Sequence, residues 1–115
     1  MTTIEELFAL SKEPPLRSVV IGDKVFALGD LSPGALADIT AWGNRLVAHA
    51  SGAPLEPGDD DPTRILQHLI FAADNDFEMT KELRKHVTPE VIVAAGREMM
   101  RQVTVRALAA HDGSA

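Results

Sequence analysis

The sequence predicts a mainly α-helical fold with a small N-terminal β-hairpin, of the α+β class, in which four to five helices pack as one compact domain. Three observations lead to this prediction. Apolar residues recur with helical spacing over most of the chain beyond residue 32. Three helix starts combine a capping residue with proline. The stretch SVVIGDKVFALGD, residues 18–30, instead indicates two strands joined by a Gly-Asp turn.

A chain of 115 residues fits a single domain with one modest hydrophobic core. Its expected parts are an N-terminal helical segment (1–14), the hairpin (17–28), a helical body (33–110) and a frayed tail (111–115). Hydrophobic residues make up 45% of the chain, which is typical of globular rather than disordered proteins. Aromatic residues are few, so we expect a core of Leu, Ile, Val, Ala and Met.

Charge and composition exclude several classes of function. The net charge of −6 disfavours non-specific binding to nucleic acid or to an anionic membrane. The chain has no cysteine, so disulfides and cysteine-based metal sites or nucleophiles are ruled out. Glu5 and Glu6 stand where a signal peptide needs basic residues, and no apolar run approaches the roughly 20 residues of a membrane span. We therefore expect a cytoplasmic protein with neither nucleic-acid nor membrane partners.

The N-terminal helix is expected to start at a cap on Thr2 or Thr3 and to stop before Pro14-Pro15. Such a short helix is stable only when it docks on another surface. That surface belongs either to the same chain or to a neighbouring subunit.

The turn at Gly22-Asp23 sets the register of the hairpin, because two central residues with Gly first place Ile21 opposite Lys24. Two apolar faces result. One carries Val19, Ile21, Phe26 and Leu28, and the other carries Val20, Val25 and Ala27. An isolated hairpin is marginal in water, so at least one face must be covered. Its edges are also able to pair with another chain.

Three main helices are expected after the hairpin. They start at Ser32-Pro33, Asp61-Pro62 and Thr88-Pro89, with a further short helix around residues 77–86. The apolar stripe of the first, which ends near Ser51, comprises Leu36, Ile39, Gly43, Leu46, Val47 and Ala50. Gly43 costs about 1 kcal/mol against Ala in a helix, so we expect it to permit the close approach of another helix.

The last helix, expected to run to about Ala110, is apolar on more than one side. Its main stripe comprises Ile92, Ala95, Met99, Val103 and Ala107, and further apolar residues lie outside that stripe: Val91, Val93, Met100 and Val105. Such a helix is buried on more than one side. It is either central in the domain or shared with another subunit.

No pattern in the sequence predicts a catalytic residue, a cofactor or a metal site. Asp74, Asp76 and Glu78 begin like a calcium loop, but Met79 and Lys85 stand where that loop needs Gly and a closing Glu. The four histidines lack metal-ligand spacing. The acids at 59–61 predict a solvated loop whose last member caps the next helix. Arg97, Arg101 and Arg106 predict the solvated side of the last helix, without the aromatic residues of a nucleic-acid surface.

Residues 16–107 resemble the phage tail assembly chaperones, a family in which a short β-hairpin is followed by a helix opening with Leu-Ser or Leu-Thr. Here the hairpin is Val19–Leu28, the joining segment is Gly29-Asp30-Leu31, and the helix opens at Ser32-Pro33. The later order also fits: the apolar helix ILQHLIFAA, the acidic turn DNDF, a short helix and then VTPEVIVAAGREMM.

The resemblance implies a non-enzymatic protein of the bacterial host cytoplasm that binds the tape measure protein and delivers it to tail tube subunits. Self-association is expected. The residues predicted to contact other chains are Val19, Ile21, Phe26, Leu28, Val91, Met99 and Met100. The alternatives are another small interaction module, such as a phage connector component or a bacterial adaptor, and, third, an enzyme that uses scattered acids and histidines.

Overall fold

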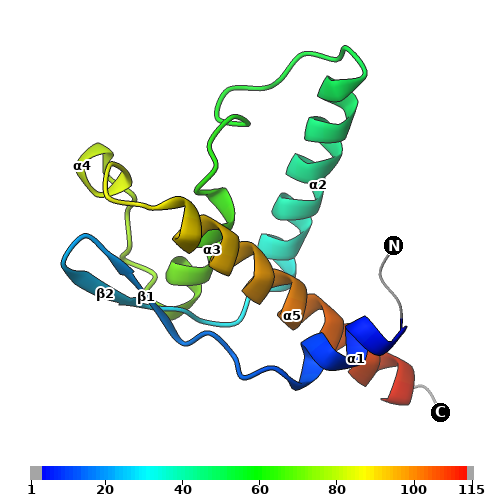
Figure 1. The fold of residues 1–115 in the computed structure, drawn as a ribbon. Coiled ribbons are helices and arrows are strands. Elements are labelled where there is room, and N and C mark those ends of the chain that lie inside the picture. Colours follow the sequence, from blue (N-terminus) through cyan, green and yellow to red (C-terminus); the bar gives the residue numbers. More distant parts are fainter. Residues whose placement is uncertain (1–3, 114–115) are drawn as a thin grey trace.

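The computed structural model describes residues 4–113. The elements in chain order are α1 (Ile4–Lys12), β1 (Ser18–Ile21), β2 (Lys24–Ala27), α2 (Pro33–Ala50), α3 (Arg64–Ala73), α4 (Lys81–Arg84) and α5 (Pro89–Gly113). The long helix α5 crosses the molecule, with α1 packed against it and the hairpin at its other end (Figure 1). The predicted fold class, mainly helical with one N-terminal hairpin, is confirmed.

The hairpin has the predicted register, with Val19 opposite Phe26 and Ile21 opposite Lys24. Gly22 adopts a φ of 66°, the positive value that the first position of this turn requires. Val19 and Ile21 are buried against the helices, and Phe26 packs edge-on to Phe77 with ring centroids 5.6 Å apart. The expectation that at least one face is covered is confirmed.

The core is small and centres on α3, which contacts α5, α2 and β2. Its buried members are Val19, Ile21, Leu31, Ile39, Leu66, Leu69, Ile70 and Ala95. Gly29 lies against α3, because its N–H donates to Leu69 O at 2.9 Å. A Cβ at Gly29 would lie 2.8 Å from the carbonyl carbon of Ala72, so only glycine fits this approach.

Helix α2 begins as predicted, since the Ser32 hydroxyl accepts a hydrogen bond from Ala35 N at 3.0 Å and Pro33 follows. Its expected apolar stripe is not a buried one: Ile39 is buried, whereas Val47 is 72% exposed. A Cβ at Gly43 would meet nothing within 4 Å, so the predicted helix contact at Gly43 is wrong within this chain. The outer half of α2 projects from the body (Figure 1).

Two helix boundaries differ from prediction. Helix α3 starts at Arg64, because the Asp61 carboxylate binds the N–H and hydroxyl of Thr63, at 2.9 and 2.7 Å, and forms a turn before the helix. Helix α5 is capped by Thr88 as predicted, but it continues through Gly113, so residues 111–113 are helical rather than a frayed tail. Helix α1 ends at Lys12, before the two prolines, and its expected caps Thr2 and Thr3 lie outside the described residues.

Polar side chains of α5 hold the two segments that flank the hairpin. Glu98, which is buried, accepts a hydrogen bond from Leu16 N at 3.0 Å. Arg101 binds the same carboxylate at 2.7 and 2.9 Å, and Arg106 donates to the backbone oxygen of Leu31. Arg97 is exposed and pairs with Glu13 of the segment after α1. The prediction of a solvated arginine face is therefore wrong for Arg101, which binds the buried Glu98 three residues earlier, and for Arg106, whose partner lies 75 positions away in sequence.

Within residues 4–113, no helix combines the length and the apolar character needed to cross a membrane.

Candidate protein-interaction site

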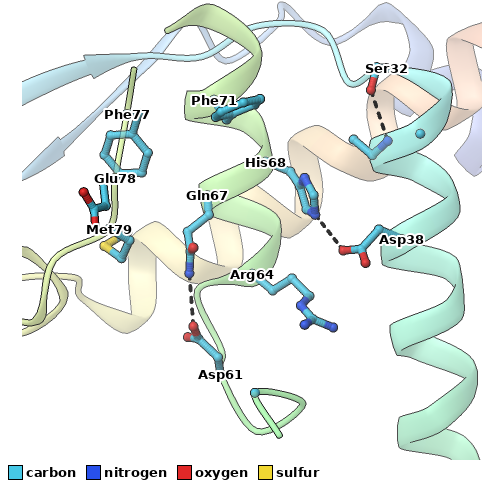
Figure 2. Close-up of a pocket in the computed structure, with 13 residues that line it drawn as sticks. Ser32, Asp38, Asp61, Arg64, Gln67, His68, Phe71, Phe77, Glu78 and Met79 are labelled. Carbon is cyan, nitrogen blue, oxygen red and sulfur yellow. Dashed lines mark hydrogen bonds and ion pairs between the residues drawn. The ribbon is translucent and has the colours of Figure 1, made fainter. Parts of the chain in front are cut away.

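A groove of about 680 Å³ opens between α2, α3 and the segment 77–79 (Figure 2). Its apolar lining comes from Phe71, Phe77 and Met79. Phe71 is 49% exposed, while Phe77 and Met79 are half-buried. A half-exposed aromatic ring in a concave wall retains apolar area that a partner could cover.

The polar walls of the groove are tied to neighbouring elements. His68 of α3 lies 2.7 Å from the carboxylate of Asp38 of α2 (Figure 2). Asp61 accepts from Gln67 at 3.0 Å and from Arg84 at 3.1 Å. Burial raises the pKa of Asp61, but hydrogen bonds from Thr63 and the nearby charge of Arg84 outweigh it and lower the pKa. Asp61 is therefore ionised at neutral pH.

Asp59 anchors the loop beside the groove and is 1% exposed. Arg45 binds both of its carboxylate oxygens, at 2.7 and 2.9 Å, and Arg64 lies 3.4 Å away. Trp42 Nε1 donates to the backbone oxygen of Asp59 at 2.8 Å, and the guanidinium of Arg64 lies 5.7 Å from the Trp42 ring. The hydrogen bond from Arg45 lowers the pKa of Asp59 despite burial.

The prediction of a solvated acidic loop is therefore wrong at Asp59. Its cationic partners, Arg45 and Arg64, come from α2 and α3, and no local sequence pattern predicts these ion pairs. An aspartate is almost never fully buried unless it is paired. The pairing fixes the loop that follows α2 against both helices, and so sets the wall of the groove at Gly58 and Arg64.

Most polar side chains of the groove already form hydrogen bonds or ion pairs within the chain. The hydroxyl of Ser32, at the rim, caps α2, and the imidazole of His68 pairs with Asp38. Across the part of the chain that the structure describes, no three histidine or acidic side chains gather where a metal ion could bind. What the groove offers is shape, an apolar lining and carboxylates.

The seven residues predicted to contact other chains fall into two groups. Val19 and Ile21 are buried in the core, and Phe26, Leu28, Val91 and Met99 are half-buried against it. Met100 is exposed, at 47%. The hairpin face assigned to a partner is thus the one that packs on the helices, and the opposite face, with Val20 and Val25, is the available one. Both faces carry apolar residues, but the covered face has the larger ones, including Ile21, Phe26 and Leu28.

Sequence reasoning missed Phe71. It follows the buried residues Leu69 and Ile70 and so looks like part of the core stripe. A usable signal exists, because Arg64, His68 and Phe71 recur at spacings of four and three and share the polar side of α3. An aromatic residue on that side points away from the core.

The chain matches no protein-family model, no curated protein and no solved structure.

Proposed function

We propose that this chain is a non-enzymatic, self-associating binding protein of the phage tail assembly chaperone type. In this role it binds the tape measure protein and tail tube subunits in the bacterial cytoplasm while the tail assembles. A long helical client with apolar stripes would aggregate if left uncovered. A small helical protein with spare apolar surface is suited to covering it.

One observation carries the proposal: the outward face of the hairpin is apolar and uncovered. Val20 and Val25 form a cross-strand pair and are 56% and 69% exposed. Each strand also has an edge without a strand partner within residues 4–113, since the sheet has two strands. Strand edges of this kind pair readily with another chain. A second copy that adds its own hairpin would extend the sheet and cover both valines.

Further exposed apolar side chains support a binding role. Val47 lies on the projecting half of α2, and Val93 and Met100 lie on α5; Val47 and Val93 are largely exposed and Met100 is about half exposed. These positions are spread over two helices far from the hairpin in sequence. Several separate apolar surfaces suit a protein that contacts its own copies and a client at the same time.

The test uses the double variant Val20→Asp/Val25→Asp. The wild-type chain is expected to form concentration-dependent oligomers in light scattering, and the double variant is expected to be monomeric with an unchanged helical circular dichroism spectrum. Val19→Asp is the matched control on the buried face. It should lose cooperative folding, because it places an unpaired charge in the core. A wild-type chain that stays monomeric at high concentration would contradict self-association.

Client binding is tested separately by co-expression with a tape measure protein encoded beside the gene. Co-purification of the two proteins, with the client kept in solution, is the expected result. A client that aggregates equally with and without this chain would contradict the chaperone role.

A further inference from the structure

We propose that the groove between α2, α3 and residues 77–79 binds one face of an amphipathic helix of a partner protein, and that lysine or arginine borders the apolar face of that helix. The inference rests on the proposed function, in which the client is a helical protein. It adds where on this chain such a helix docks and which charges it carries.

The lining favours the apolar face of a helix. Phe71 is the aromatic residue among the exposed large hydrophobic side chains of the described part of the chain. Phe77 and Met79 lie beside the same space, on the segment that follows α3 (Figure 2). Aromatic and methionine side chains adapt to the apolar residues of a docking helix. A volume of about 680 Å³ accommodates several such side chains.

The walls favour a helix over an extended peptide. Helices α2 and α3 form two sides of the groove, and their backbone groups are engaged in their own helical hydrogen bonds. An extended segment needs partners for its backbone N–H and C=O groups, and strand addition supplies them at a sheet edge. A helix satisfies its backbone internally and presents side chains alone.

The charge around the groove defines the border of that helix. Three carboxylates line it, those of Asp38, Asp61 and Glu78. His68 pairs with Asp38, Arg84 pairs with Asp61, and Arg64 shares Asp59 with Arg45. Glu78 is therefore the lining carboxylate that has no ion pair within residues 4–113.

The segment leading to Phe77 adds further negative charge. Asp74, Asp76 and Glu78 are exposed, and no ion pair within residues 4–113 neutralises them. Three uncompensated carboxylates beside an apolar lining attract a basic border and repel an acidic one. The occupant is therefore a helix with an apolar face and basic flanks.

The experiment uses two synthetic helical peptides of about four turns with the same leucine pattern, one with lysine and one with glutamate at the polar positions. Trp42, the single tryptophan, reports on the groove because Arg64, which lines it, packs over the Trp42 ring. Binding is followed by Trp42 fluorescence and by calorimetry. The lysine peptide is expected to bind at least about tenfold more tightly than the glutamate peptide.

Two variants locate the binding. Phe71→Ser should weaken the lysine peptide by about tenfold or more, because it removes the central apolar contact. Glu78→Lys should weaken the lysine peptide and strengthen the glutamate peptide. The matched controls are Val105→Ser, an exposed apolar residue of α5, and Asp23→Lys, an exposed acid of the hairpin turn, neither of which lines the groove. Neither control is expected to change either affinity.

Equal affinity for the two peptides, or binding that neither groove variant alters, would overturn the proposal. Because Phe71 and Glu78 are exposed, both variants should keep the wild-type circular dichroism spectrum, and Glu78→Lys decides the question if Phe71→Ser does not fold. A client that co-purifies equally with the wild type and with Phe71→Ser would refute docking in the groove while leaving the proposed function intact. The proposal would also be refuted if a second copy of this chain occupied the groove. In that case Phe71→Ser would lose self-association, and the wild-type chain would bind neither peptide.

Discussion

The side-chain oxygen of Gln102 accepts a hydrogen bond from the backbone N–H of Leu31 at 2.7 Å, across 71 positions of sequence. The amide nitrogen of the same side chain donates to the backbone oxygen of Gly29 at 3.1 Å. Gln102 is buried, so it replaces water for two backbone groups of the segment that joins the hairpin to α2. One side chain of α5 thereby fixes the path of the backbone between the hairpin and α2.

We expect Gln102→Ala to lower the free energy of unfolding by about 1–3 kcal/mol, because it strands a buried donor and leaves an acceptor short of a partner. Urea denaturation measures the change. Arg97→Ala is the control on the same helix, since the exposed Arg97–Glu13 pair should contribute less than about 1 kcal/mol. Equal losses in the two variants would contradict the role given to Gln102.

The stability of the protein should fall in acid through Glu98. Burial raises the pKa of Glu98, but hydrogen bonds from Arg101, Gln102 and Leu16 N outweigh it, so the folded-state pKa lies below the ordinary pKa of a glutamate. The unfolded state then binds more protons in acid. The stabilisation is complete well above the ordinary pKa of a glutamate and is lost as the pH falls through the lower folded-state pKa.

Denaturation midpoints measured at a series of pH values test this behaviour. Glu98→Gln should be less stable at neutral pH and should lose less stability in acid, because it removes one of the titrating groups. Asp59 and Asp61, whose pKa values are also lowered, retain part of the acid dependence. An identical acid slope in Glu98→Gln would contradict the assignment.

Two glycines should respond to alanine in opposite directions. At Gly29 the new Cβ would lie 2.8 and 2.9 Å from backbone atoms of α3, which cannot move as a side chain can. Gly29→Ala is therefore expected to cost about 1–3 kcal/mol. At Gly43, where nothing lies within 4 Å, alanine should stabilise the chain by about 1 kcal/mol through helix propensity. Thermal denaturation compares them, and a destabilised Gly43→Ala would contradict an open face on α2.

Substitution should distinguish the role of the buried Asp59 from that of its exposed neighbour Asp60. Asp59→Asn should destabilise the protein and shift Trp42 emission to longer wavelength, because the contacts to Arg45 and Trp42 loosen. Asp60→Asn is the matched control, since Asp60 is exposed. Fluorescence and limited proteolysis of the loop provide the readouts. The pairing at Asp59 would be contradicted by two variants that behave alike.

Features that depend on neighbouring residues in the chain could be predicted from the sequence. The Ser32 and Thr88 caps act on N–H groups three residues later, and the turn at Gly22-Asp23 sets the strand register by itself. The start of α3 was misplaced even at this range. Asp61 offered two local bonding patterns, and its side chain took the turn with Thr63 rather than the cap.

The sequence predicted that exposed apolar surface would exist, but it did not predict the location of the groove. Spare apolar surface was expected on the hairpin and on the last helix, and Met100 lies exposed where this expectation put it. The groove combines α2, α3 and residues 77–79, so Phe71 acquires a role when those elements are packed together. The periodicity of residues within α3 does not predict which other elements pack against that helix.

By itself, the sequence determined that the chain forms helices and one hairpin, and in which register the strands pair, because these follow from contacts a few residues long. The tertiary structure decided which hairpin face is buried, since both carry apolar residues; the face that packs on the helices is the one with the larger side chains, Val19, Ile21 and Phe26. It also decided that Asp59 is paired rather than solvated and that Gly43 faces open space. Each of these outcomes depends on which distant residues come close when the elements pack.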